Sequence, residues 1–215
     1  MCAICSAAES HYKPHISVGA HAGMDMSRVS FSPSIEQKWL QGITGGLQIR
    51  YAEERLVGLL AEVNFTQRGW SENFEGTSLE YSRTANYVSI PIMTHIYFGP
   101  SRCKFFFNLG PEFSYMISES TSTNFDVTNI GALPEWPEDP RMIEQLTTPI
   151  KNKFDYGICA SFGVEFWVRP RHSVYIEGRY YFGLGNIFPS SKADTFGASR
   201  NMSISATIGY NFRLR

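Results

Sequence analysis

The feature that most constrains this chain is a two-residue alternation of apolar and polar side chains, repeated over most of its length. In the segment 57–68, the apolar residues Val57, Val63 and Phe65 fall on odd positions, and the even positions are mainly polar. Successive side chains of a β-strand point to opposite faces, so this segment has one apolar and one mainly polar face. The pattern predicts an all-β chain.

Eight segments of the sequence show this alternation. They are, approximately, residues 16–26, 43–51, 57–68, 88–98, 105–118, 154–166, 174–184 and 202–213. Most are about 11 to 14 residues long, whereas a tilted strand needs only about 9 to 11 residues to cross the hydrocarbon of a bilayer. No stretch approaches the roughly 18 apolar residues of a transmembrane helix. We therefore expect an eight-stranded antiparallel up-and-down transmembrane β-barrel.

The connections between these segments alternate between short and long. The short ones lie near 53–55, 98–102 and 169–172, and the long ones near 27–40, 70–80, 119–151 and 187–199. Outer-membrane barrels have short periplasmic turns and longer extracellular loops. Aromatic residues also gather near both strand ends, with Tyr51 at the short-turn end and Trp70 and Tyr115 at the long-loop end. These residues are typical of the two interfacial girdles, and together the features predict an outer-membrane location.

The composition of the two faces predicts which one points inward. Charged residues make up only 18% of the chain and aromatics 14%, which suits a protein with a large lipid-facing surface. We expect the apolar face to contact lipid and the polar face to form a hydrated ion-pair network in the lumen, because an unpaired buried charge is costly. The predicted lumen residues are Arg50, Glu62, Arg68, His95, Glu112, Asp155, Glu165, Glu177 and Arg179. The structural rival, a soluble lipocalin-like ligand carrier, would place the apolar face inside.

Two prolines, Pro91 and Pro111, interrupt predicted strands. Proline lacks the N–H that a ladder hydrogen bond needs, and a closed barrel has no edge strand to accommodate it. We expect local bulges there, or a bound water.

The chain ends and the cysteines carry weaker signals. Residues 1–10 resemble the end of a secretory signal, with small residues near Ala7, and residues 11–215 form one barrel domain. Cys2 and Cys5 have the spacing of a metal-ligand pair but lack a second pair, so we expect neither a metal site nor a cofactor. The net charge of −1 gives no reason to expect a nucleic-acid partner.

Several strand motifs resemble the PorT-like family of outer-membrane β-barrels. They are Asn64-Phe-Thr-Gln-Arg-Gly-Trp70, Tyr87-Val-Ser-Ile-Pro-Ile92, Gly110-Pro-Glu-Phe-Ser-Tyr115, Asp155-Tyr-Gly157 with Gly163-Val-Glu-Phe166, Glu177-Gly-Arg-Tyr-Tyr181 and Ile208-Gly-Tyr-Asn-Phe212. The similarity extends over roughly residues 15–213 and consists of strand patterns without a catalytic signature. It implies an eight-stranded barrel in which Pro91 and Pro111 are family features. The family's named member is tied to type IX protein secretion.

The sequence contains no strong catalytic constellation. His95 and Glu112 share the predicted lumen with Ser89 and Ser114, but structural hydrogen bonding explains these residues better than catalysis does. The acidic, proline-rich segment 133–140 in the longest loop surrounds Trp136, which is either a partner-recognition residue or a side chain packed on the barrel rim.

We therefore expect a non-enzymatic scaffold or interaction protein, in contact with outer-membrane lipid and with other envelope or secretion proteins. The alternatives are a small passive or ligand-gated pore, a lipid-modifying enzyme that uses His95 and Ser114, and the soluble carrier. An eight-stranded lumen is normally filled by side chains, which argues against the pore.

Overall fold

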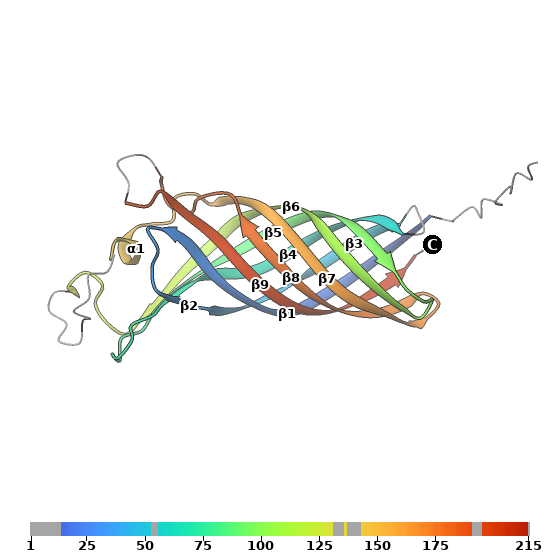
Figure 1. Cartoon of the computed structure of the whole chain (residues 1–215), viewed down its shortest axis with the longest axis horizontal. Helices are drawn as coiled ribbons and strands as arrows, with labels where there is room; N and C mark the ends of the chain where they lie inside the picture. The colour runs from blue at the N-terminus through green and yellow to red at the C-terminus, as the bar shows by residue number, and fades with distance from the viewer. Residues whose placement is uncertain (1–13, 53–55, 131–135, 137–142, 191–194, 215) are drawn as a thin grey trace, which may run out of the picture.

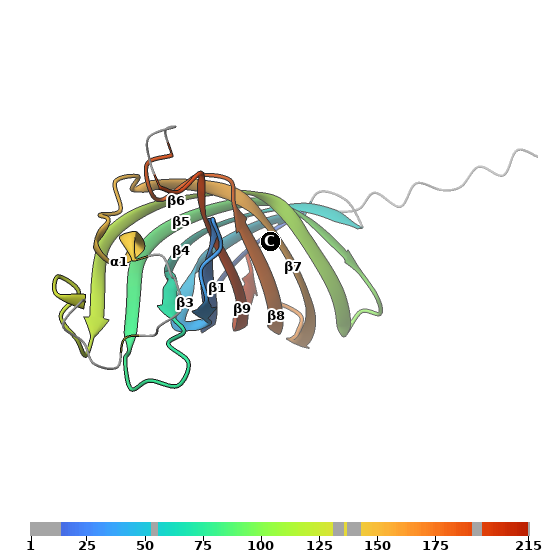
Figure 2. The ribbon, with the colours of Figure 1, turned by 60° about the vertical axis from the view of Figure 1, so that its left-hand side comes forward.

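The computed structural model is a closed barrel of tilted strands (Figures 1 and 2). It describes residues 14–52, 56–130, 136, 143–190 and 195–214. The predicted leader at 1–10 with Cys2 and Cys5, the predicted turn at 53–55 and all of the segment 133–140 except Trp136 lie outside these residues.

The described chain consists of strands, with one short helix in the longest loop. The elements are β1 (His15–Ser32), β2 (Gln37–Lys38), β3 (Leu40–Ala52), β4 (Val57–Glu72), β5 (Tyr81–Phe98), β6 (Cys103–Thr123), α1 (Glu144–Thr147), β7 (Phe154–Arg169), β8 (His172–Gly183) and β9 (Ala198–Arg213). No helix of the described chain is long and apolar enough to cross a membrane.

Eight strands form the barrel wall, and each is antiparallel to both of its neighbours. The order around the ring is β1, β3, β4, β5, β6, β7, β8 and β9. The ring closes where β9 pairs with β1, with Ser17 opposite Arg213. The two-residue strand β2 adds to the loop end of β4, with Gln37 opposite Glu72. The predicted eight-stranded antiparallel barrel is confirmed.

The apolar face of the wall points outward. Val63, Ile90 and Phe162 are 55%, 45% and 55% exposed, respectively, although each lies in the middle of a strand. A lipocalin-like barrel would bury these side chains in a central core, so the soluble carrier is excluded. Such a large exposed apolar band needs a hydrocarbon solvent, and the protein sits in a lipid bilayer.

Several strands are longer than predicted. β1 and β5 each have 18 residues and β6 has 21. Most of the additional residues lie at the loop end, where the outward-facing positions become polar, as at Ser30 and Thr84. The wall therefore continues beyond the apolar band into water.

This extension corrects one prediction about the aromatic girdles. Tyr51 and Tyr115 face outward, with 40% and 54% exposure. Trp70 is only 1% exposed and lies inside the barrel, so its assignment to a girdle is wrong.

The expectation of bulges at the two prolines is also wrong. Pro91 lies opposite Glu112, and Pro111 lies opposite Ile158, and neither register shifts at the proline. On the other side of each proline two ladder pairs are missing: the pairing of β4 with β5 passes from Ala61–Ile92 to Asn64–Ser89, and that of β5 with β6 passes from Pro91–Glu112 to Thr94–Leu109. The register shift between β5 and β6 falls instead between Asn86 and Tyr87. The wall accommodates both prolines without inserting a residue.

Candidate functional site

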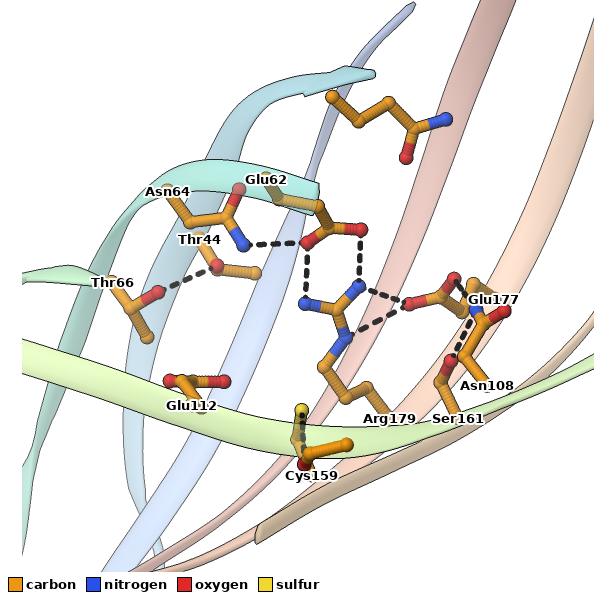
Figure 3. Close-up of polar contacts among 12 residues, drawn as sticks. Thr44, Glu62, Asn64, Thr66, Asn108, Glu112, Cys159, Ser161, Glu177 and Arg179 are labelled. Carbon is orange, nitrogen blue, oxygen red and sulfur yellow. Dashed lines mark hydrogen bonds and ion pairs between the residues drawn. The ribbon is translucent and has the colours of Figure 1, made fainter. Parts of the chain in front are cut away.

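The centre of the lumen is occupied by Arg179, which lies between two carboxylates from different strands (Figure 3). Its guanidinium donates to both oxygens of Glu62 on β4 at 2.7 and 2.8 Å. It also donates twice to Oε1 of Glu177, its neighbour on β8, at 2.9 and 2.7 Å. All three side chains are at most 10% exposed. One arginine thus bridges the interior from β8 to β4.

A second ion pair lies nearer the loop end. Arg68 on β4 donates to Glu112 on β6 at 2.5 Å, and the hydroxyl of Ser114 donates to the same carboxylate at 3.3 Å. The guanidinium carbon of Arg68 lies 3.8 Å from the ring centroid of Tyr181. This stacking holds the cation against the wall while its charge is matched by Glu112.

A third ion pair lies nearer the turn end. Arg50 on β3 contacts both oxygens of Glu165 on β7 at 3.1 and 3.0 Å. The same carboxylate accepts from the Ser173 hydroxyl at 2.7 Å and from the Asn211 side chain at 3.0 Å. Glu165 on β7 therefore has partners on three other strands, β3, β8 and β9.

The two remaining predicted lumen residues also lie inside, bound to neutral partners. His95 Nδ1 lies 2.6 Å from Oδ1 of Asn108, and Asp155 accepts from Asn201 at 2.9 Å. The structure pairs His95 with Asn108 and Glu112 with Arg68, so it does not bring His95 and Glu112 together as a catalytic pair. All nine predicted lumen residues face the interior.

The sequence-based list omitted the asparagines and serines that connect these charges. Asn108 donates to Ser161 at 2.8 Å and to Glu177 at 3.3 Å, which joins His95 to the central cluster. These residues share the strand parity of the charged ones, and that parity was the signal that could have identified them.

The lumen is filled. Two internal cavities of about 10 Å³ each lie beside the charged network. A cavity needs about 10–15 Å³ to hold one water molecule, so neither has room for more than about one. Side chains are also closely packed between the adjacent strands β6 and β7, where a Cβ at Gly163 would lie 2.3 Å from the Phe106 ring.

The loop end is closed by an apolar cluster, which we call the extracellular cluster. Its buried residues are Val29, Phe31, Trp70, Phe74, Tyr81, Ala85, Tyr87, Met116, Leu146, Ile150, Ile187, Phe188 and Phe196. The Trp70 ring packs edge-on against Phe31 and Phe188, with centroid distances of 5.5 and 5.9 Å. Tyr81 donates its hydroxyl to the carbonyl oxygen of Leu146 at 3.0 Å, which fastens α1 over the mouth.

Trp136 lies at the margin of this cluster. Its ring centroid is 5.5 Å from that of Phe74 and 6.0 Å from that of Phe125. These contacts describe a partly buried tryptophan packed on the rim of the barrel.

Metal-binding geometry is not found in the described part of the chain. No group of three or more His, Cys, Asp or Glu side chains lies close enough there to hold a metal ion. Cys103 and Cys159 are both free thiols.

Comparison with known proteins identifies the family. The chain matches the family described as outer membrane protein beta-barrel domain over residues 9–189. No curated protein matches its sequence. OprG from Pseudomonas aeruginosa has a similar structure, with a TM-score of 0.54 and 10% identity, covering 94% of this chain and 96% of OprG.

Two further structures resemble the chain more distantly. Neisserial surface protein A has a TM-score of 0.45 and 17% identity over 92% of this chain and 96% of its own. Ail, the attachment invasion locus protein of Yersinia pestis, has a TM-score of 0.43 and 12% identity over 92% of this chain and 99% of its own. The family match covers most of the sequence and agrees with the outward apolar band. The chain therefore belongs to the outer membrane protein beta-barrel domain family and is located in the outer membrane.

Proposed function

We propose that this protein is a non-conducting outer-membrane scaffold that acts through interactions at its two ends. The observation that carries the proposal is the filled lumen. Buried ion pairs occupy its centre, and the extracellular cluster covers its outer mouth. A water-filled path would need much larger spaces than the two cavities of about 10 Å³.

Planar-bilayer recording tests this proposal. The purified protein should give no steady single-channel currents at any voltage that the bilayer tolerates. A variant with Trp70→Ala and Phe188→Ala, which opens the outer mouth, should also stay silent, because the ion pairs below still fill the lumen. Steady currents from the unmodified protein would favour the alternative of a small pore.

The resemblance to the PorT-like family suggests that the partners are envelope or secretion proteins. Pull-down from detergent extracts would identify them. Deletion of residues 125–145 would then show whether the long loop with Trp136 is the recognition element. If the deletion variant retains every partner, the interaction would be assigned to the periplasmic end of the barrel.

The proposal includes the absence of enzymatic activity. The polar atoms that an enzyme would use are engaged, because Asn108 binds His95, and Arg68 binds both Glu112 and, at 3.4 Å, Ser114. Replacement of His95 and Ser114 should leave the lipids of the membrane unchanged by mass spectrometry. An altered lipid profile would favour the lipid-modifying enzyme.

A further inference from the structure

The periplasmic end of the barrel differs from the closed outer end. It opens onto a cavity of about 1080 Å³, slightly larger than the roughly 300–1,000 Å³ typical of ligand sites. Four cationic side chains line it, namely Arg102, Lys104, Arg169 and Arg213. None of the described residues that line it is acidic.

These four cations have no carboxylate partner among the described residues, unlike the arginines of the lumen. Glu165 lies just above them and shares a small cavity with Lys104 and Arg213. Its carboxylate is bonded to Arg50, Ser173 and Asn211 and forms no ion pair with any of the four cations in the described chain, and one carboxylate cannot balance four cations.

Aromatic rings hold two of the cations in the mouth. Lys104 Nζ lies 4.5 Å from the Tyr97 ring centroid, and the guanidinium carbon of Arg213 lies 4.1 Å from that of Trp167. Within this second pair, Nε of Arg213 and Nε1 of Trp167 are buried and have no hydrogen-bond acceptor among the described residues. This wall therefore carries a surplus of donors and suits a ligand rich in acceptor oxygens.

The position of these four cations favours a water-borne ligand over membrane lipid. Lys104 has the same strand parity as the fully buried Phe106, and Arg213 the same parity as the buried Asn211, so both face the inside of the mouth. The outward positions at this level, such as Phe105 and Tyr210, present apolar surface to the lipid. A lipid headgroup would have to leave its leaflet to reach these cations, whereas a periplasmic chain enters directly from water.

We propose that the periplasmic cavity binds an acidic segment of a periplasmic polypeptide, through carboxylates that pair with Lys104, Arg213, Arg102 and Arg169. The inference names the partner chemistry for one end of the proposed scaffold and rests on that function. Several cations spread around one large cavity fit a chain of carboxylates better than a single small anion.

The test is the binding of fluorescein-labelled hexaglutamate to the full-length barrel in phosphatidylcholine nanodiscs, followed by fluorescence anisotropy. Hexaglutamate should bind, and its affinity should fall as salt is added, because exposed charges are screened. Lys104→Gln with Arg213→Gln should weaken binding by roughly tenfold or more. Arg102→Gln with Arg169→Gln should also weaken it, and because both side chains are exposed, at the β5–β6 turn and at the end of β7, this pair should leave the fold intact.

The matched control removes the same charge from the other end of the barrel. Lys151→Gln with Lys153→Gln, both at exposed loop positions, should leave the affinity unchanged. An equal loss in this control, equal binding of hexaglutamine, or no binding of hexaglutamate would overturn the proposal. Displacement of hexaglutamate by the water-soluble headgroup glycerophosphoglycerol, at constant ionic strength, would assign the cavity to a lipid headgroup and also overturn it. None of these results changes the conductance, which tests the scaffold function separately.

Discussion

The membrane-spanning part and the extracellular extension of this barrel are built from the same strands with opposite interiors. On β5, Ile90 and Ile92 face outward and Ser89 and His95 face inward within the membrane. Nearer the loop end of the same strand, the outward positions are polar and Tyr81 and Tyr87 face inward. The period of two continues through both parts. The solvent outside the wall therefore decides which residue type fills the inside.

The physical reason is that each part buries the side chains that its surrounding solvent solvates poorly. In hydrocarbon, apolar side chains gain nothing by moving inside, and the interior becomes the place for polar groups that can satisfy one another. In water, the hydrophobic effect drives aromatic rings into the interior. The extension thus encloses a small apolar core like that of a water-soluble protein, which we call the aqueous-type core. The membrane part has the opposite arrangement, with a polar interior and an apolar exterior.

The largest expected effect is the loss of the central arginine in the membrane part. Arg179→Leu leaves Glu62 and Glu177 without their shared cation and should destabilise the barrel by about 3–5 kcal/mol. Urea unfolding in lipid vesicles, followed by tryptophan fluorescence, measures this change. Combining it with Glu62→Gln and Glu177→Gln removes the unpaired charges and should restore part of the stability. A triple variant no more stable than the single one would contradict the pairing argument.

The next largest effect concerns the aqueous-type core. Trp70→Ala removes the ring that contacts both Phe31 and Phe188 and should cost about 3 kcal/mol. Limited proteolysis of the loops in intact membranes should show the loss locally, while a gel of unheated samples should still show a folded barrel. An unchanged digestion pattern would mean that the extracellular cluster does not hold the loops.

A smaller effect is expected where a charge is placed on the lipid-facing surface. Ile92→Lys, in the middle of the apolar band of β5, should cost about 2 kcal/mol, because a lysine near the bilayer centre loses its hydration. The same unfolding titration measures it. A neutral outcome would place this band outside the hydrocarbon.

The smallest effect is the matched change on the same strand. Ser82 faces outward in the extension and lies between Ser71 and Ser122 on the neighbouring strands. The substitution Ser82→Lys should change the free energy of unfolding by less than about 0.5 kcal/mol. If Ser82→Lys and Ile92→Lys cost the same, the boundary between the two parts would be wrong.

The alternation predicted the membrane part well because one physical rule acts along every strand. Outward residues such as Val63 and inward ones such as Glu62 follow directly from that period. The partner of each arginine could not be predicted, because Arg179 meets Glu62 across the lumen through the closure of the ring.

The extension was missed for a different reason. Trp70 alternates like its neighbours, so the period identifies its face but not the solvent outside it. The cluster that buries Trp70 also includes Phe188 and Phe196 from the long connection between β8 and β9, and no local pattern predicts where such loop residues dock. The periplasmic cations, in contrast, could have been found by continuing the strand parity to Arg213.

The junction between β9 and β1 has a consequence for how the barrel is made. It joins the first and last strands of the wall along 16 residue pairs, from Ser17 with Arg213 to Ser32 with Ala198. Until these strands meet, every partial assembly has two unpaired edges whose N–H and C=O groups find no partner in hydrocarbon. A half-inserted sheet is therefore not a stable intermediate. We expect insertion of the wall and pairing of β9 with β1 to occur as one cooperative event.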